Sequence, residues 1–354
     1  MKFHPSEEQD LIQASIRGTL ADTFPHGRRQ ALLDAETDFD VPVWNALMEL
    51  GLAGLMVPAS LGGSGLGLVD AALAAEALGL EGAPGPFASH MLATYAIAEA
   101  APDDIKDRWL AELLSGRARA TLAIDDTWLP EAWRSGSALD CTFSLVPGAD
   151  MADLFVVGLS GGLLAIVDRE ASTIDVAKLQ NADRTRRLSK LSLKTSHATP
   201  LGDSTFATKL FDSALVLLAA DAFGGAQRCL SMTVDYVQTR HQFGVPLAQF
   251  QAIKHQLADM AVELEPARAL VWYAAYALDR NLPDASRRAS LTKAHLADRF
   301  TSITRASVLA HGGIGYTWEY DLQVWFRRAL FDNAFLGSPS LHRERAAALA
   351  SWAQ

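Results

Sequence analysis

The chain has 354 residues, of which 49% are hydrophobic, and its formal net charge is −10. This length and apolar content predict a large buried core shared by two or three structural units, and they exclude a disordered protein. The acidic balance argues against nucleic acid or an anionic membrane as the main partner, so any anionic ligand must be met by local basic groups.

The two cysteines, Cys141 and Cys229, belong to no C-x-x-C pattern and no Cys/His cluster. They predict a reducing compartment, no disulfide framework and no metal site. The N-terminus MKFHPSEEQD contains no apolar signal core, and the longest aliphatic run, residues 214–220, is far below the roughly 20 residues that cross a bilayer. We therefore expect a soluble, cytoplasmic protein without membrane insertion.

Residues 1–118 predict several short helices around one core. Ser6 followed by Gln9 is a capping-box pattern at the start of a helix. Pro42 suits the first turn of a second helix, and Asp103 opens a further amphipathic segment. This part of the chain should form an N-terminal α-helical domain.

Residues 119–203 have a different pattern, which predicts a small β-domain. The stretch LFVVGLSGGLLAIVD, residues 154–168, places two apolar runs on either side of a Ser-Gly-Gly turn. The segments STIDV and LSKLSL then add short alternating runs, so three or more strands are expected here.

Residues 204–354 return to the helical period in long stretches, at about 205–240, 247–279 and 284–311. Pro266 should kink or divide the second of these stretches. The helical, β, helical order predicts an α+β protein in which a C-terminal four-helix bundle packs beside the β-domain and the N-terminal helices.

Five blocks of this sequence resemble the acyl-CoA dehydrogenase family, and the similarity covers nearly the full chain. The C-terminal blocks are GGAQRCLSMTVDYVQTRHQFGVPLAQFQAIKHQLADM and AHGGIGYTWEYDLQVWFRRA. The N-terminal blocks are SEEQDLI, WNALMELGLAGLMVPASLGGSGLGLVDAALAAEALG and KDRWLAELLSG. The resemblance implies the family's fold, FAD as cofactor and an acyl-CoA as substrate.

In that family the first C-terminal block contacts the FAD of a neighbouring subunit, which here implies Arg240, Phe243 and Gln251. The residue types suit this role. A guanidinium offers a planar fork of donors to a pyrophosphate, an aromatic ring packs on adenine, and an amide bonds polar edges. An isolated arginine at a helix end usually just meets solvent and the helix dipole, so the inference depends on the whole block.

The second block places glycines against the same FAD in the family, which here implies Gly312, Gly313 and Gly315. Glycine permits close approach of the backbone to a phosphate or ribose. A lone G-G-x-G is usually only a turn, and the preceding His311 could equally be a capped, buried imidazole, so we assign it no catalytic role.

The chain departs from the family where the β-domain begins. Complete members carry a segment like TEPGAGSD and a later Trp-x-Thr element that hold the flavin. The corresponding region, residues 123–157, reads AIDDTWLPEAWRSGSALDCTFSLVPGADMADLFVV and lacks both. The resemblance therefore implies that this chain can reach the adenine and pyrophosphate half of an FAD without its own cradle for the ring.

The family's reaction needs a carboxylate that removes the α-proton of the thioester while the β-hydrogen leaves as hydride to the flavin. The two usual positions of this base correspond to Leu336, before Gly337, and to a site near Ala214, with Leu215 where a substrate-binding Arg is often found. All are apolar here.

Asp221 is the remaining carboxylate worth weighing as a base. It interrupts an apolar run seven residues after Ala214, nearly two helical turns, so it should share that face. Burial there would raise its pKa, which suits a base. Alternatively, Asp221 pairs with an Arg or caps a neighbouring element.

These departures resemble the small subunit of the heteromeric α2β2 acyl-CoA dehydrogenases of bacterial steroid and related side-chain catabolism. A larger partner subunit would then hold the flavin ring and the base, and an electron-transfer flavoprotein or a similar acceptor would take the electrons. Two alternatives stay open: a self-sufficient homo-oligomeric dehydrogenase with Asp221 as base, and a non-catalytic structural subunit. No residue identifies the acyl group.

Overall fold

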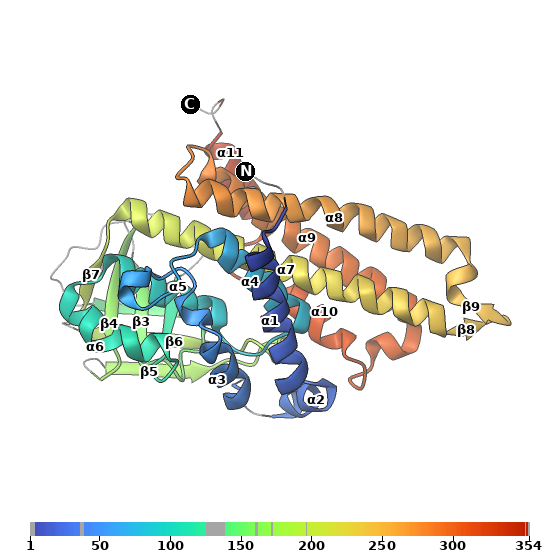
Figure 1. Ribbon diagram of the computed structural model, residues 1–354, viewed down its shortest axis with the longest axis horizontal. Coiled ribbons are helices and arrows are strands. Elements are labelled where there is room, and N and C mark those ends of the chain that lie inside the picture. The colour runs from blue at the N-terminus through green and yellow to red at the C-terminus, as the bar shows by residue number, and fades with distance from the viewer. Residues whose placement is uncertain are drawn as a thin grey trace.

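The computed structural model describes residues 4–35, 39–124, 139–159, 162–170, 173–195, 197–350 and 352. Two small sheets lie at one end of the molecule, the N-terminal helices lie beside them and across the middle, and long C-terminal helices extend to the other end (Figure 1). Among the described helices, none is long and apolar enough to cross a membrane. Cys141 and Cys229 are free thiols.

The N-terminal part is helical, as predicted. Its helices are α1 (Glu7–Thr23), α2 (His26–Asp34), α3 (Val41–Glu49), α4 (Leu68–Glu81), α5 (Phe87–Ala100) and α6 (Asp103–Leu114). The predicted capping box is confirmed, because the Ser6 side chain accepts from the backbone of Gln9 while the Gln9 side chain accepts from the backbone of Ser6. Asp40 caps α3, and Pro42 occupies its first turn.

The middle part forms two sheets. The strands are β1 (Ala120–Ala123), β2 (Leu139–Pro147), β3 (Leu154–Leu159), β4 (Leu163–Asp168), β5 (Thr173–Lys178), β6 (Leu188–Thr195) and β7 (Thr199–Leu201). One sheet has the order β1-β3-β4-β7 and the other β2-β6-β5. The predicted antiparallel pairing of β3 with β4 is confirmed, although residues 160–161 of its turn lie outside the described residues. Phe143, Phe155 and Leu191 pack in one buried cluster that both sheets share.

The C-terminal part consists of long helices. They are α7 (Ser204–Thr239), α8 (Gln251–Asp279), α9 (Ala285–His311), α10 (Leu322–Ala334) and α11 (Pro339–Ala348). Helices α7, α8, α9 and α10 pack on one another, which confirms the predicted bundle (Figure 1).

Helix α8 differs from its prediction in two ways. It runs through Pro266 as one helix, so of the two expected outcomes, a kink or a division, the division is wrong. Pro266 and Val262 are both exposed, and water can therefore bond the Val262 carbonyl that loses its helical partner. Helix α8 also begins later than predicted, at Gln251, because residues 247–249 form a separate 3-10 turn, η3 (Leu247–Gln249), and Phe250 has an extended backbone. A hairpin of β8 (His241–Gln242) and β9 (Val245–Pro246) precedes this turn.

Two glycines allow α4 to cross α7 at close range. A Cβ on Gly79 would lie 2.1 Å from the backbone oxygen of Asp221, and one on Gly224 would lie 2.0 Å from that of Glu76. Any larger residue would push the helices apart. This crossing joins the N-terminal helices to the bundle and fixes the environment of Asp221.

Candidate functional site

The two C-terminal sequence blocks meet at one end of the bundle. We call this end the tip, and it comprises Arg240, the β8–β9 hairpin, Gln251 and the helical turn η4 (Gly312–Tyr316) (Figure 1). The Tyr236 hydroxyl donates to the His311 carbonyl at 3.2 Å, which joins the end of α7 to the start of that turn. The structure therefore places both blocks, and with them the residues that were predicted to bind the cofactor, at the same end of the bundle.

Phe243 is the most unusual residue of the tip. Its side chain is 91% exposed, and its backbone has a φ of +53°, in the left-handed region. A bulky residue in that conformation is strained by about 1 to 3 kcal/mol. Its ring lies edge-on to Phe250 with a centroid distance of 6.1 Å. Packing inside this chain does not account for an exposed, strained aromatic ring, whereas contact with another molecule would.

The three glycines of η4 have different reasons to be glycine. Gly312 has a φ of +65°, and a Cβ on the buried Gly315 would lie 2.8 Å from the Val308 carbonyl oxygen. A Cβ on Gly313 would meet no atom of the described chain within 4 Å. The fold thus requires the first and third glycines, and Gly313 leaves an open, exposed backbone.

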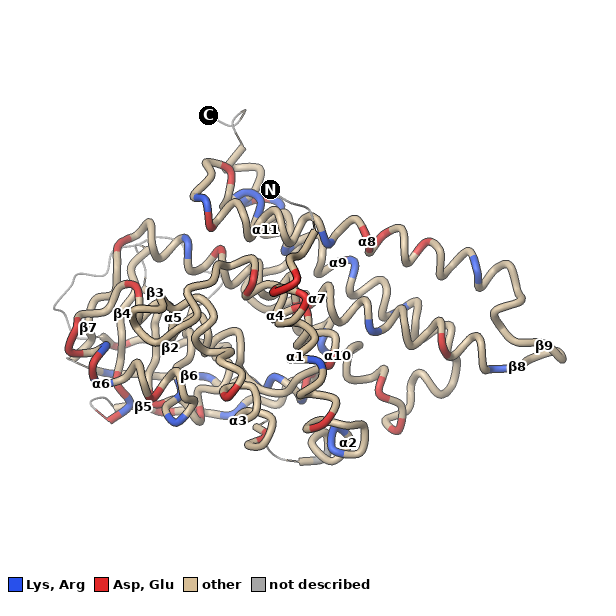
Figure 2. Tube along the Cα trace, viewed as in Figure 1, with Lys and Arg blue, Asp and Glu red and all other residues tan. Residues whose placement is uncertain are grey.

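Arg240 gives the tip a cation free to meet an anion. It is exposed and forms no ion pair with any residue that the structure describes. Neither β8 nor β9 contains an acidic residue (Figure 2). Gln251 is also exposed, at the first position of α8. A guanidinium, an aromatic ring, an amide and open backbone are groups that bind a dinucleotide with a pyrophosphate.

His311 lies beneath η4 and is 3% exposed. Its Nδ1 is 2.7 Å from the Ser307 carbonyl oxygen, and its Nε2 is 3.2 Å from the Tyr320 hydroxyl. Burial lowers its pKa, so the ring is neutral at physiological pH. Both nitrogens have partners inside the chain, which supports the interpretation of His311 as a buried, bonded imidazole.

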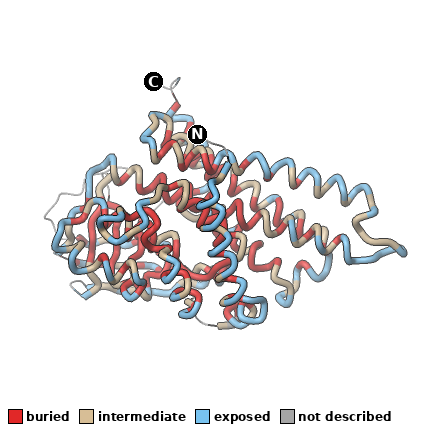
Figure 3. Tube along the Cα trace, viewed as in Figure 1, coloured by how far each residue is buried: buried red, intermediate tan, exposed pale blue. Residues whose placement is uncertain are grey.

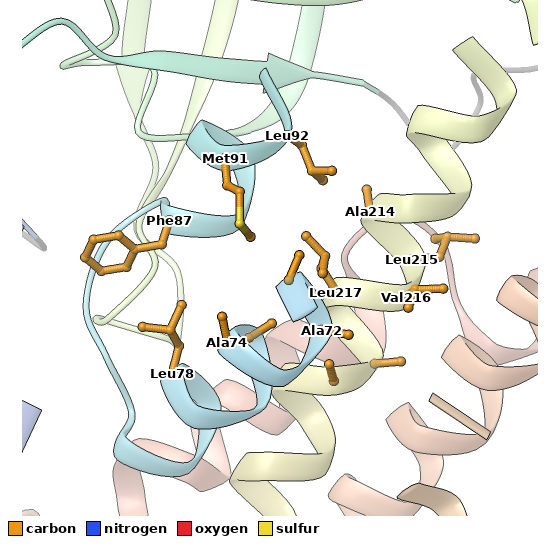
Figure 4. Close-up of a cluster of buried hydrophobic side chains, with 14 of the residues drawn as sticks. Ala72, Ala74, Leu78, Phe87, Met91, Leu92, Ala214, Leu215, Val216 and Leu217 are labelled. Carbon is orange, nitrogen blue, oxygen red and sulfur yellow. The ribbon is translucent and has the colours of Figure 1, made fainter. Parts of the chain in front are cut away.

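A second site is a cavity of about 80 Å³ between α4, α5, α7 and α10. Figure 4 shows part of its apolar wall. Ala214 and Leu336, which the resemblance placed at or near the family's usual carboxylate positions, both lie on this wall. Other lining residues are Leu78, Phe87, Leu92, Leu122, Leu217, Phe331 and Phe335.

The turn at Leu336 is rigidly held although its side chain has no acid–base chemistry. Leu336 has a φ of +56°, and its carbonyl accepts from Nε2 of His342 at 2.8 Å. Nζ of the buried Lys293 donates to the Gly337 carbonyl at 2.6 Å and to that of Asn333 at 3.2 Å. Burial lowers the pKa of Lys293 to about 8.

Asp221 is the one carboxylate among the described cavity-lining residues, and two arginines neutralise it. Nε of Arg328 donates to Oδ2 at 3.0 Å, Nη2 of Arg328 bonds Oδ1, and Nη2 of Arg186 donates to Oδ2 at 3.0 Å. Burial alone would raise the pKa of Asp221, but the two guanidiniums outweigh burial and lower it. The expected raised pKa is therefore wrong, and the alternative that Asp221 pairs with an Arg is confirmed.

The same network contains groups that the sequence interpretation missed. Nη1 of Arg186 lies 2.9 Å from Oδ1 of Asp332, and Nε of Arg186 lies 3.3 Å from Oδ2 of Asp183. Burial, with the like charge of Asp221 nearby, raises the pKa of Asp332 well above its ordinary value. Asp183 and Arg186 are three positions apart in a polar stretch, whereas Asp332 lies 146 positions after Arg186, and no local pattern in the sequence joins the two segments.

The tip and the cavity are well separated. Asp221 lies on α7 and Arg240 directly follows the last residue of that helix, 19 positions later, which corresponds to about 28 Å at 1.5 Å per residue. The expected absence of a flavin cradle concerns the segment between β1 and β2, and residues 125–138 of that segment lie outside the described residues.

Comparison with known proteins identifies the class to which this fold and site belong. Residues 6–117 match the family model of the acyl-CoA dehydrogenase N-terminal domain, and residues 205–350 match that of the C-terminal domain. The chain belongs to the acyl-CoA dehydrogenase family of oxidoreductases, whose cofactor is FAD.

Individual relatives extend over the whole chain. Acyl-CoA dehydrogenase IpdE2 of Mycobacterium tuberculosis is 31% identical, over 95% of this chain and 95% of its own length. IpdE2 of Mycolicibacterium smegmatis is 32% identical, over 94% and 96%. The solved structure of the Tcur3481-Tcur3483 steroid acyl-CoA dehydrogenase (G363A variant) is 28% identical over 97% of each chain, with a TM-score of 0.89.

Proposed function

We propose that this chain is the smaller subunit of a heteromeric, FAD-dependent acyl-CoA dehydrogenase, and that its tip completes the FAD site of a larger partner subunit. The observation that carries the proposal is Phe243, a strained and 91% exposed aromatic ring beside Arg240, which has no ion-pair partner among the described residues. Neither feature is accounted for by packing within the described chain. Both suit a flat, anionic ligand held by another molecule.

The residues of the tip fit the adenine and pyrophosphate half of FAD. Arg240 would pair with the pyrophosphate, Phe243 would pack on the adenine, and Gln251 would bond polar edges. The open backbone at Gly313 would permit close approach of the cofactor. When bound, FAD supplies the acceptor for the hydride lost from the acyl chain. The contribution of this chain is to bind and orient the cofactor.

The cavity of this chain does not suit the chemical step. Its volume of about 80 Å³ is well below the ~300 to 1,000 Å³ of typical ligand pockets. Its carboxylate is paired with two arginines, and Leu336 and Ala214 offer no base. Proton abstraction from the substrate would therefore fall to a carboxylate of the partner subunit.

The relatives support a heteromeric assembly and a bulky substrate. The steroid dehydrogenase of known structure is named by two components, Tcur3481 and Tcur3483. The solved structure of the ChsE4-ChsE5 complex of Mycobacterium tuberculosis shares the fold, with 22% identity and a TM-score of 0.86. We propose an α2β2 assembly that acts on a bulky or steroid side-chain acyl-CoA and transfers electrons to an electron-transfer flavoprotein or a similar acceptor.

Purification with and without the larger dehydrogenase subunit tests the proposal. We expect the chain alone to be colourless, and the complex to contain flavin and to oxidise acyl-CoA. Arg240→Ala and Phe243→Ala should each lower the flavin-to-polypeptide ratio of the complex. Arg280→Ala, an exposed residue directly after the opposite end of α8, should leave that ratio unchanged. A stoichiometric yellow flavoprotein formed by this chain alone would contradict the proposal.

Two other functions make different predictions. If the chain is a self-sufficient homo-oligomer with Asp221 as base, Asp221→Ala should abolish turnover while flavin stays bound. The two ion pairs of Asp221 argue against that role. If the chain is a purely structural subunit, Arg240→Ala should change neither the flavin content nor the activity of the complex.

A further inference from the structure

A cluster of two tyrosines and one histidine supports η4 from below. The His311 ring stacks on Tyr236 with a centroid distance of 4.3 Å and lies 5.0 Å from the ring of Tyr320. Tyr236 and Tyr320 lie edge-to-face at 6.4 Å. The three rings come from α7, the end of α9 and the segment before α10, so they connect three elements beneath the tip.

The hydrogen bonds of His311 determine which nitrogen carries the proton. The Ser307 carbonyl, 2.7 Å from Nδ1, can only accept, so Nδ1 must be protonated. The neutral ring then offers Nε2 as an acceptor, and the Tyr320 hydroxyl donates to it at 3.2 Å. Tyr320 therefore orients the imidazole through one defined bond.

The ends of η4 are held by other residues, while its middle is open. The Tyr236 hydroxyl donates to the His311 carbonyl at one end, and Nε2 of Gln323 donates to the Gly315 carbonyl at the other. Gly312 and Gly313 are exposed and carry no side chain that could anchor them. The position of their backbone is therefore set by what holds His311 and Gly315.

Tyr236 also lies one helical turn before Arg240. The same cluster thus sets the position of the glycine turn relative to the proposed pyrophosphate-binding arginine. We propose that Tyr320 is a positioning residue that acts through His311 to hold the backbone of Gly312 and Gly313 in register with Arg240 for FAD. This inference rests on the proposed function, because it assumes that the tip binds FAD.

The test compares two variants that each lose one hydrogen bond of this region. Tyr320→Phe removes the bond to His311 Nε2. Ser307→Ala removes a buried bond from Ser307 Oγ to the Cys229 carbonyl, 3.3 Å long, and leaves the Ser307 backbone that bonds His311. Both are made in the flavin-binding assembly of this chain, whether with a larger subunit or with a second copy. Titration of the apo-assembly with FAD gives the Kd, and urea unfolding gives the stability.

We expect Tyr320→Phe to raise the Kd for FAD about fivefold, the effect of losing one neutral hydrogen bond. Ser307→Ala should leave this Kd unchanged. It should lower the stability in urea unfolding, because it also loses one neutral hydrogen bond. If the two variants shift the Kd equally, or if Tyr320→Phe does not shift it, the inference fails. Arg240→Ala separates this failure from failure of the proposed function, since an unchanged Kd in that variant contradicts FAD binding at the tip.

Discussion

The tip and the cavity lie along the same helix, α7, but they satisfy their polar groups in opposite ways. Around the cavity, Asp221 is paired with Arg186 and Arg328 inside the chain. At the tip, Arg240 has no ion-pair partner among the described residues and Phe243 is exposed. Exposed residues predominate at that end of the bundle (Figure 3). Groups that a chain satisfies internally maintain its fold, whereas groups that it leaves exposed under strain point to another molecule.

The largest expected effect concerns the ion pairs at the cavity. Arg328→Ala leaves the buried Asp221 with a weaker set of partners, and it should lower the free energy of unfolding by about 3 to 5 kcal/mol. Arg288→Ala breaks a half-exposed pair with Asp284 and a contact 5.4 Å from the centre of the Tyr273 ring, and should cost less than about 1 kcal/mol. Urea unfolding of both variants measures the difference. Equal effects would mean that the network at the cavity is not structural.

The buried histidines should make the fold sensitive to acid. Burial lowers the pKa of His90 and of His342 to about 4, below the ordinary value of 6.5. Both rings are neutral in the folded state. Their contribution to the free energy of unfolding is therefore complete well above pH 6.5 and is lost as the pH falls. The loss of unfolding free energy between pH 6.5 and 5 should be about 1.5 kcal/mol for each ring. Unfolding free energies at these two pH values check this, and a flat profile would contradict it.

The crossing of α4 and α7 should tolerate no added methyl group. Gly79→Ala places a Cβ against the Asp221 carbonyl and should destabilise the fold by about 1 to 3 kcal/mol. Gly18→Ala, on the exposed side of α1 with no atom within 4 Å of the new Cβ, should stabilise it by up to about 1 kcal/mol. Thermal unfolding of the two variants gives the sign of each stability change. Equal shifts in Tm would contradict the conclusion that the close approach of α4 and α7 requires Gly79.

Phe243→Gly should separate stability from cofactor binding. Glycine adopts a positive φ without strain, so the unfolding free energy of the chain should change by less than about 1 kcal/mol. The flavin affinity of the assembly should fall about tenfold, the effect of losing a stacked aromatic side chain. Asn281→Gly, which changes another residue with positive φ two residues after the other end of α8, should leave the flavin affinity unchanged. Unaltered flavin affinity in Phe243→Gly would contradict the interpretation of the exposed Phe243 ring as a contact for the cofactor.

The smallest effect is expected at Gly313. Alanine there meets no atom of the described chain within 4 Å, so the stability of the isolated chain should change by less than about 0.5 kcal/mol. The Kd for FAD in the assembly should rise, because the methyl group would obstruct the cofactor. Calorimetric titration measures this Kd, and a value equal to that of the unsubstituted assembly would remove Gly313 from the site.

Local signals in the sequence predicted most of the fold. The Ser6–Gln9 capping box, the pairing of β3 with β4 and the long helices of the bundle all depend on short-range patterns. The β8–β9 hairpin was missed because its turn places Phe243 in a left-handed conformation, where glycine or asparagine is usual.

The site was predicted less completely. The family blocks marked the residues of the tip, but the sign of the pKa shift at Asp221 depends on Arg186 and Arg328, which are 35 and 107 positions away. No local pattern brings such residues together. The pKa of a buried group therefore requires the tertiary structure, whereas the residues of a linear motif do not.

Helix α7 places the wall of the cavity and the base of the tip on one continuous segment of 36 residues. Each residue of an α-helix advances 1.5 Å and turns 100° about the axis. Inserting a single residue between Asp221 and Arg240 would therefore swing the guanidinium about 100° around the bundle. A change in the length of this helix would turn the arginine away from its proposed ligand. We therefore expect the segment between Asp221 and Arg240 to accept substitutions but not insertions or deletions.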